Sequence, residues 1–310
     1  MTPATKPLEK LTIGIPVLNC RDTIESCLLP LFEIVNPEVF TIIILVSDSD
    51  DGSIDVIKEI CRSNDKTNIE IIFDGPAKGI EHAIWKLVEL SKTEWIWLLS
   101  GDDIPVKNWF QLVSSFLEKN HDLAVFQTIQ ANSLGEPLFY RNNMKPTNSV
   151  AERSYIFPEQ KKAFLSKIKS TDAIFSCISN VIFKKSMWQH ISEDKYAHYK
   201  KTNFMHSMRL LANLNTATRM KVYGEPLVVK RGGEDSFSKL GLIRRALMTY
   251  ESYGQQLEGF SRTELAFIKS AADYEWPWYR CIKVISGTKE SQLKHKFLRS
   301  RFRSWSIIFV

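Results

Sequence analysis

Apolar runs alternate with helical patterns along about the first hundred residues of the chain. The segments between the runs repeat apolar residues at helical spacing, which predicts helices over about residues 23–35, 53–62 and 80–90. Continuous apolar strands that alternate with amphipathic helices indicate an α/β fold, with a mostly parallel sheet covered by helices on both faces. The apolar runs predict strands at Leu11–Val17, Phe40–Val46, Ile69–Phe73 and Trp95–Leu99.

The pattern becomes looser after Asp103. Residues 132–158 are polar and rich in turn formers, so we expect a surface excursion there. Residues 240–274 have a largely helical pattern. Further strands are predicted at Leu123–Ile129, Ile178–Phe183 and Pro226–Val229.

These patterns divide the chain into two parts. We expect an α/β domain over residues 1–235, made of a first half (1–105) and a second half (106–235). A helical C-terminal extension is expected over residues 236–310.

Composition fits an ordinary globular protein, because 44% of the 310 residues are hydrophobic and 25% are charged. The five cysteines show no Cys-x-x-Cys spacing, which favours a reducing compartment and argues against a structural zinc site. The first residues lack the apolar segment of a signal peptide, and no apolar run approaches the length that spans a bilayer. The sequence therefore predicts a cytoplasmic protein.

The net charge of +6 is unevenly spread, with a basic stretch at the C-terminus. Cations interleaved with aromatic side chains suit an anionic membrane surface, because the charges meet headgroups and the rings lie at the interface. We therefore predict peripheral contact with the cytosolic face of a membrane, and a solvated basic tail is the alternative. Nucleic acid is not expected as a partner, because no nucleic-acid-binding module accompanies the tail. The cations are Lys294, Lys296, Arg299, Arg301 and Arg303.

Two adjacent carboxylates follow the fourth predicted strand. The apolar run that begins at Trp95 stops at Asp102, Asp103 and Pro105, so both acids lie just past the carboxyl end of a strand. Open α/β sheets hold their ligands at that edge, and paired carboxylates suit Mg²⁺ or Mn²⁺ carrying a diphosphate. The alternative is a turn with two solvated acids, and in either case we expect exposed loop side chains that contribute little to stability.

Three further loops are expected at the same edge of the sheet. The first contains Pro16 and Asn19; the second, residues 47–53, is acidic and contains Asp48. A carboxylate at position 48 can accept hydrogen bonds from a base or ribose, and Gly52-Ser53 supply a turn and a helix N-cap. Asp51 fits either a ligand contact or a cap. In the third loop, residues 75–79, Lys78 fits either a diphosphate contact or a solvated lysine.

Four segments together resemble the ordered motifs of family 2 glycosyltransferases with the GT-A fold. Three later segments, residues 175–188, 201–211 and 224–233, are similar to the acceptor-side regions of bacterial enzymes that build O-antigen and exopolysaccharide, including abequosyltransferase-like members. Neither a Gly-x-Gly-x-x-Gly nor a P-loop motif is present, which argues against an NAD domain or a P-loop fold. The four motifs are Ile13–Asn19, Val46–Ser53, Lys78–Ile84 and Trp95–Ile104.

The resemblance implies a nucleotide-sugar donor bound in the first half and a glycan acceptor, expected to be lipid-linked, bound in the second. It implies a divalent ion on Asp103, the first choice as ligand, and on Asp102, which also contacts the donor. The chain departs from the family at Gly101, which stands at the first position of the Asp-x-Asp motif. The expected donor contacts are Pro16, Asn19, Asp48, Asp51, Lys78, Asp102 and Arg231; for Arg231 the alternative is pairing with a nearby carboxylate.

Family 2 enzymes invert the anomeric centre, which requires a general base for the acceptor hydroxyl. The usual acid precedes an Arg-Leu pair, and that register places Asn203 at the position of the base. His206 lies one helical turn further on the same face, so His206 together with Asp102 forms the predicted catalytic set. Other candidates for the base are Glu193, Asp194, Glu234 and Asp235.

The sequence therefore predicts an inverting glycosyltransferase of bacterial surface polysaccharide synthesis. One rival is a sugar-phosphate nucleotidyltransferase, whose glycine-rich, arginine-containing opening loop is missing after Val17. The other rival is a non-catalytic, membrane-associated protein that binds nucleotide sugars. It stays an alternative because Gly101 and Asn203 stand where the family has acids.

Overall fold

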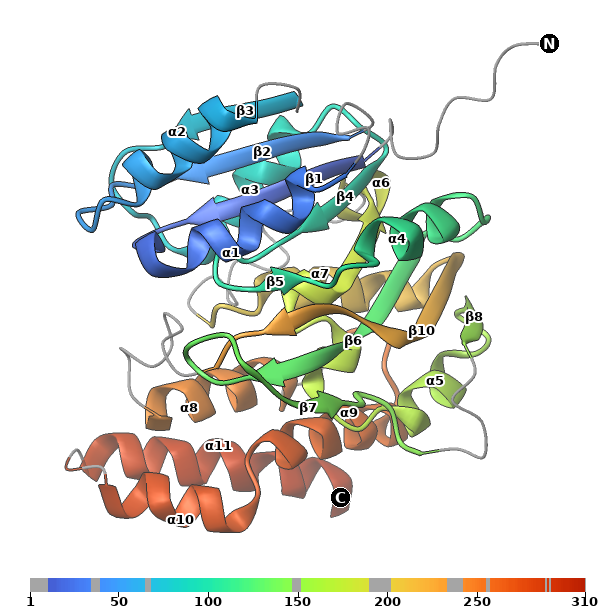
Figure 1. Cartoon of the computed structure of the whole chain (residues 1–310). Helices are drawn as coiled ribbons and strands as arrows, with labels where there is room; N and C mark the ends of the chain where they lie inside the picture. Colours follow the sequence, from blue (N-terminus) through green and yellow to red (C-terminus); the bar gives the residue numbers. More distant parts are fainter. Residues whose placement is uncertain are drawn as a thin grey trace.

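The computed structural model describes residues 11–34, 40–64, 68–146, 152–189, 202–232, 242–254, 257–287, 289 and 291–309. The first half is a parallel sheet in the order β3-β2-β1-β4 (Figure 1). Its strands are β1 (Leu11–Val17), β2 (Thr41–Val46), β3 (Asn68–Phe73) and β4 (Trp95–Leu98). The helices between them are α1 (Arg21–Phe32), α2 (Ser53–Ser63) and α3 (Ile80–Leu90). The elements predicted from the apolar pattern are confirmed here.

The second half continues the same sheet with mixed strand directions. β9 (Val181–Lys184) runs antiparallel between β4 and β6 (Leu123–Ala131), and β10 (Thr218–Lys230) runs parallel to β6. The short β5 (Ile104–Pro105) pairs with the end of β10 and so places the loop after β4 beside that strand. The sheet is therefore parallel in the first half and mixed in the second.

Two predictions for the second half were wrong in detail. The expected surface excursion over residues 132–158 contains β7 (Pro137–Arg141), antiparallel to β6, and β8 (Arg153–Phe157), antiparallel to β10. Both strands add to the sheet from outside its main path and leave much of their surface exposed, so the apolar pattern of a buried strand is missing. The predicted strand 178–183 begins instead with the 3₁₀ turn Ile178–Asn180.

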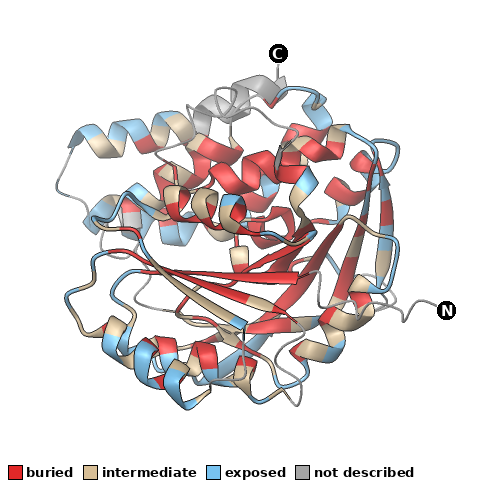
Figure 2. Cartoon of the chain, turned by 90° about the horizontal axis from the view of Figure 1, so that it is seen from above, coloured by how far each residue is buried: buried red, intermediate tan, exposed pale blue. Residues whose placement is uncertain are grey.

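Hydrophobic clusters lie on both faces of the sheet. One contains residues of α1, α2 and α4 (Trp109–Leu117), and the larger one joins α3 and α7 (Met205–Ala212) to the C-terminal helices. The larger cluster runs from Ile43 in β2 to Phe297, so the C-terminal helices share a core with the sheet (Figure 2). The remaining helices are α5 (Lys161–Lys167), the 3₁₀ turn η3 (Thr171–Ile174), α6 (Lys185–Gln189), α8 (Leu242–Tyr253), α9 (Arg262–Glu275), α10 (Trp278–Gly287) and α11 (Ser291–Phe309).

The basic C-terminal stretch lies in the helix α11, and its predicted contact with a membrane stays a prediction. In α11, Phe297 is fully buried and Arg301 is almost fully buried. The Arg301 guanidinium donates to the carbonyl of Trp276 (2.7 Å) and lies over the Trp278 ring, 4.4 Å from its centroid. Lys296 pairs with Glu251 of α8 (2.6 Å). The side chains of residues 302–310 are outside the described part.

Among the described residues, no helix combines the length and the apolar character needed to cross a membrane.

Candidate active site

The loops that follow β1, β2 and β3 are hydrogen-bonded to one another at the carboxyl edge of the sheet. The N–H of Asn19 donates to the Ser49 hydroxyl (3.1 Å), and the Asn19 side-chain oxygen accepts from the N–H of Asp50 (3.2 Å). The N–H of Asp48 donates to the carbonyl of Gly75 in the third loop (2.9 Å). The predicted convergence of these three loops is confirmed.

Asp51 links the N-termini of two helices. Its Oδ2 accepts from the N–H of Arg21 (2.8 Å) in α1, and its Oδ1 accepts from the N–H of Ser53 (2.9 Å) in α2. Burial would raise the pKa of the Asp51 carboxyl, but hydrogen bonds from Ser53 and Arg21 outweigh burial and lower it. This geometry fits the capping role, which was one of the two roles that the sequence allowed for Asp51. A contact between Asp51 and the donor stays a prediction.

Asp48 and Lys78 both reach solvent at this edge. The Asp48 side chain is exposed, whereas Asp74 nearby is nearly buried and contacts His82 (2.8 Å), Lys86 and, at 3.9 Å, Lys78. The hydrogen bond from Lys86 outweighs burial and lowers the pKa of Asp74. Of the three side chains that contact Asp74, Lys78 has the longest contact and the most exposed side chain. It is therefore the one that could most easily move to bind a diphosphate.

Asp102 and Asp103 differ in their surroundings. Asp103 is only 4% exposed, and its Oδ1 accepts from the N–H of Arg231 at the end of β10 (3.1 Å). Asp102 is half-buried and accepts from the Ser100 hydroxyl (2.5 Å). Burial, and then the charge of Asp102, raises the pKa of Asp103 to about 7. The expectation that position 103 holds an exposed loop acid was wrong, because β10 and β5 cover it.

The Arg231 guanidinium donates to three protein oxygens. Its Nε donates to the carbonyl of Asp102 (3.0 Å), its Nη1 to the carbonyl of Ser133 (3.0 Å) and its Nη2 to the Ser26 hydroxyl (2.9 Å). These bonds hold the acidic loop, α1 and the β6–β7 turn together. Among the described residues, no carboxylate pairs with the guanidinium, and its predicted phosphate contact remains a prediction.

The comparisons with known proteins decide the family. The model of Glycosyl transferase family 2 matches residues 12–190, which is more than half of the chain. The chain belongs to this family. Family membership selects a glycosyltransferase over the two rival classes, the nucleotidyltransferase and the non-catalytic binding protein.

A curated relative and two solved structures extend the comparison. The abequosyltransferase RfbV of Salmonella typhimurium is 26% identical over 279 residues, which cover 86% of this chain and 81% of the relative. TarS 1–349 of S. aureus with UDP-GlcNAc aligns over 96% of this chain and 81% of its own, with 11% identity and a TM-score of 0.64. The mannosyltransferase PcManGT of Pyrobaculum calidifontis with GDP-Man and Mn²⁺ aligns over 96% and 83%, with 12% identity and a TM-score of 0.57. The family 2 chain has the predicted GT-A fold.

Gly101, where this family 2 enzyme departs from the Asp-x-Asp motif, is tightly enclosed. A Cβ at this position would lie 3.3 Å from the Cys20 sulfur and 3.4 Å from the carbonyl of Pro16. The Thr23 hydroxyl donates to the Gly101 carbonyl (3.1 Å), so the acidic loop is bound to the first turn of α1. A carboxylate side chain has no room here, which leaves Asp102 and Asp103 as the acids of the motif.

These two acids fit a divalent cation. Their oxygens are hard ligands, and Mg²⁺ or Mn²⁺ is often held by one or two carboxylates together with substrate phosphates. Burial and the charge of Asp102 raise the pKa of Asp103, and a bound cation would favour the charged form of this carboxyl. No cluster of three or more potential side-chain ligands occurs among the described residues.

Asn203, which the sequence predicts at the position of the family's general base, has a left-handed conformation with φ of 61°. Asparagine tolerates this conformation better than most residues, which gives a backbone reason for its presence. His206 in α7 is 5% exposed, and its Nε2 faces the carbonyl of Ser176 at 3.4 Å. Burial lowers the pKa of His206 to about 4. The four alternative acids, Glu193, Asp194, Glu234 and Asp235, lie outside the described residues.

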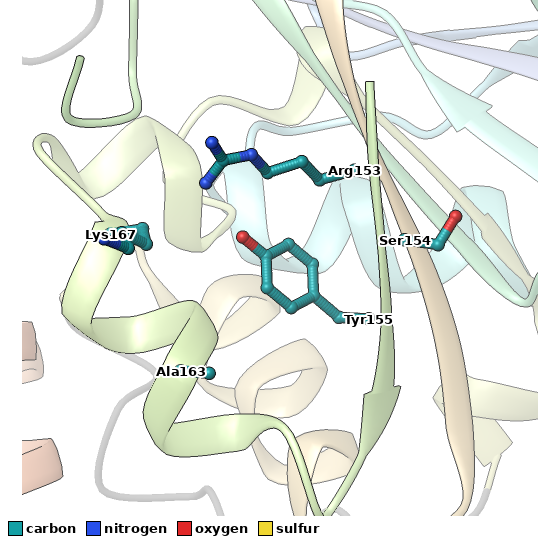
Figure 3. Close-up of a pocket in the computed structure, with 5 residues that line it drawn as sticks. All are labelled: Arg153, Ser154, Tyr155, Ala163 and Lys167. Carbon is teal, nitrogen blue, oxygen red and sulfur yellow. The ribbon is translucent and has the colours of Figure 1, made fainter. Parts of the chain in front are cut away.

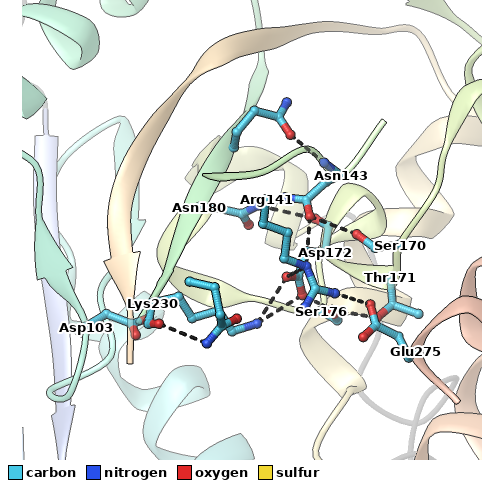
Figure 4. A network of polar contacts seen from close by, with 12 residues as sticks. Asp103, Arg141, Asn143, Ser170, Thr171, Asp172, Ser176, Asn180, Lys230 and Glu275 are labelled. Atoms are coloured by element: carbon cyan, nitrogen blue, oxygen red, sulfur yellow. Dashed lines mark hydrogen bonds and ion pairs between the residues drawn. The ribbon is translucent and has the colours of Figure 1, made fainter. Parts of the chain in front are cut away.

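A chain of four charged side chains around the buried Asp172 leads away from the acidic loop, and sequence reasoning missed it (Figure 4). Lys230 contacts both oxygens of Asp172 in η3 (3.2 and 3.1 Å), and Arg141 at the end of β7 lies 3.4 Å from Asp172. Arg141 also pairs with Glu275 at the end of α9. The opposite charge of Lys230 also acts on Asp103. The four residues are far apart in sequence, so no local pattern could have linked them.

A separate pocket of about 310 Å³ lies between β8 and α5 (Figure 3). It is lined by Arg153, Ser154, Tyr155, Ala163 and Lys167. β8 pairs with the beginning of β10, whereas the acidic loop lies at the end of β10. This pocket is therefore not part of the site.

Proposed function

We propose that the protein is an inverting glycosyltransferase that moves a sugar from a nucleotide-sugar donor to a glycan acceptor. The observation that carries this proposal is the acidic pair after β4, the buried Asp103 and the half-buried Asp102, in a loop at the carboxyl edge of the sheet that α1 binds through the Gly101 carbonyl. The curated relative is an abequosyltransferase, which supports a place in bacterial surface polysaccharide synthesis. We infer a lipid-linked acceptor at the cytosolic face of a membrane.

Each part of the site has a distinct role in this proposal. Asp48 accepts hydrogen bonds from the nucleoside, and Lys78 lies against the diphosphate. Asp102 and Asp103 would hold Mg²⁺ or Mn²⁺, which supplies positive charge that stabilises the departing nucleoside diphosphate. His206 is our candidate for the group that takes the proton of the acceptor hydroxyl.

Incubation of the purified protein with single nucleotide sugars and Mn²⁺ tests the proposed activity. We expect one donor to be hydrolysed slowly without acceptor, and to raise the unfolding temperature in a thermal-shift screen because ligand binding stabilises the folded state. Absence of hydrolysis and of stabilisation across the common UDP-, GDP-, TDP- and CDP-sugars would reject the proposal.

Asp48→Ala should weaken binding of the free nucleoside diphosphate by about tenfold, because a hydrogen bond to a charged group is worth about 1.5–3 kcal/mol. Calorimetric titration of the nucleoside diphosphate, without any sugar, measures the effect. Asp50→Ala is the matched control, because Asp50 is also an exposed acid of this loop and contacts Asn19 through its backbone alone. Equal affinities of the Asp48 variant and wild type would refute the assignment.

His206→Asn should lower turnover by about 10²-fold or more if His206 is the base, while the affinity for the nucleotide stays near that of wild type. The pKa of about 4 means that the imidazole is neutral from about pH 5 upward, so a basic form is present at neutral pH. Kinetics of His206→Asn and His206→Ala under single-turnover conditions provide the measurement. Near-normal turnover in either folded variant would make His206 structural and return the search to the four alternative acids.

A further inference from the structure

The outer face of α10 is an exposed apolar surface on the C-terminal extension. Tyr279 is 76% exposed, Ile282 62% and Trp278 50%, and positions 278, 279 and 282 are neighbours on one side of a helix. The adjoining side of α10 is packed, because Cys281 is buried and Ile285 contacts the larger hydrophobic cluster. Large exposed aromatic side chains in contiguous patches indicate an interaction surface.

Cations border these apolar side chains. Arg280 and Lys283 are exposed on the same helix, and we call the five residues 278, 279, 280, 282 and 283 the α10 face. Residues 276–310 contain eight of the 41 lysines and arginines of the chain but one of its 35 acidic residues. The remaining residues are therefore close to neutral, and the basic excess of the protein belongs to α10, α11 and their connection.

We propose that the α10 face docks on an anionic lipid bilayer, with the Trp278 and Tyr279 rings at headgroup depth and the cations against lipid phosphates. Trp and Tyr favour the membrane interface because one part of the ring system is apolar and the other is polar. A second copy of this chain is a poorer occupant, because a symmetric contact would bring two strongly basic surfaces together. The inference rests on the proposed function at the membrane. It assigns the membrane contact to α10 rather than to the basic C-terminal stretch.

A chain of ion pairs connects the residues just before α10 to the active site. Tyr274 and Glu275 end α9 just before α10, and Glu275 pairs with Arg141, the first link of the chain of charges that reaches Lys230 (Figure 4). Lys230 immediately precedes Arg231, whose N–H binds Asp103. In Figure 1, α10 lies at the end of the molecule opposite β3 and α2, which leaves the nucleotide half away from the bilayer.

The double variant Tyr279→Ser/Ile282→Ser tests the proposal in the full-length protein. Both side chains are mostly exposed, so the variant should fold and hydrolyse the nucleotide-sugar donor at the wild-type rate. We expect wild type to cosediment with vesicles of phosphatidylcholine and phosphatidylglycerol, more weakly at high salt, and the variant to partition about tenfold less well or worse. Lys283→Gln should weaken binding by about fivefold, since one cation near the surface is worth about 1 kcal/mol.

The matched control is Ile156→Ser, which removes an equally exposed isoleucine (55%) from β8, far from α10 in Figure 1. This control should bind vesicles as wild type does. Equal vesicle binding by wild type and the double variant overturns the proposal, as does absence of binding by wild type. Loss of a vesicle-independent dimer in the double variant, measured by light scattering, would assign the face to self-association instead. Donor hydrolysis is measured on the same samples, so failure of the proposed enzyme activity is recognised separately.

Discussion

Asp103→Asn should abolish sugar transfer and yet make the protein more stable at pH 8. The Asp103 carboxyl is buried beside Asp102, and its pKa is raised to about 7, first by burial and then by that neighbouring charge. Asparagine keeps an oxygen for the N–H of Arg231 but removes the buried charge. We expect a loss of turnover of about 10²-fold or more, the scale for losing a group that stabilises transition-state charge.

The sign of the stability change follows from proton binding. A carboxyl whose pKa is higher in the folded protein than in the unfolded chain binds more protons when folded, so wild-type stability falls as the pH rises from about 4 to 7. Asp103→Asn should therefore raise the free energy of unfolding most above pH 7, by up to about 1.4 kcal/mol for each unit of pKa shift. The increase should vanish near pH 4. Urea unfolding at pH 5, 7 and 8 measures it.

Two comparisons make this result specific. Asp102→Asn, at the half-buried neighbour, should reduce transfer with a much smaller change in stability. Mn²⁺ with the nucleoside diphosphate should stabilise wild type and should stabilise Asp103→Asn less, because the variant has lost a carboxylate ligand. A lower stability of Asp103→Asn at pH 8, or a gain that does not depend on pH, would show that the buried charge is fully compensated in the native protein.

β1, β2 and β4 of the first half were predictable because they are buried on both faces. Such strands are continuous apolar runs, and helices between them have a clear apolar stripe, so β1 was predicted to the residue. β7 and β8 were not predicted, because each is only five residues long and lies within a segment rich in turn formers. In β10 the recognised segment Pro226–Val229 is only the end of a longer strand whose first part contains Arg219 and Lys221.

The candidate site also contains some features that the sequence predicted and others that it did not. The loop residues Asn19, Asp48 and Asp102 were found because strand ends and acidic motifs are local features of sequence. The burial of Asp103 depends on Arg231, which is 128 residues away, and the partners of Asp172 come from β7 and β10. Contacts at such separations leave no trace in periodicity or composition. The C-terminal cations were recognised, but burial of Arg301 depends on the packing of α10 and α11.

Arg141→Met should destabilise the protein by about 3–5 kcal/mol at pH 7, because removal of one partner from a buried ionic network leaves a carboxylate without compensation. Burial alone would raise the pKa of Asp172, but the charges of Lys230 and Arg141 outweigh it and hold this pKa well below its usual range. The stabilisation is therefore present above the unfolded-state pKa of about 4 and is lost as the pH falls below it, so the deficit of the variant should narrow in acid. Urea unfolding from pH 3 to 7 measures the loss in the free energy of unfolding and its dependence on pH.

A second substitution tests whether the charge balance causes this loss. Arg141→Met/Glu275→Gln removes one charge of each sign and leaves the Asp172–Lys230 pair intact, so the double variant should be more stable than Arg141→Met alone. Lys296→Met is the matched control, because its 2.6 Å pair with Glu251 has a side chain that is 60% exposed, and exposed pairs are worth about 1 kcal/mol or less. Two results would contradict this role of the charges around Asp172 in holding the C-terminal helices to the active site. One is that Arg141→Met lowers the free energy of unfolding no more than this control does; the other is that Arg141→Met/Glu275→Gln is less stable than Arg141→Met alone.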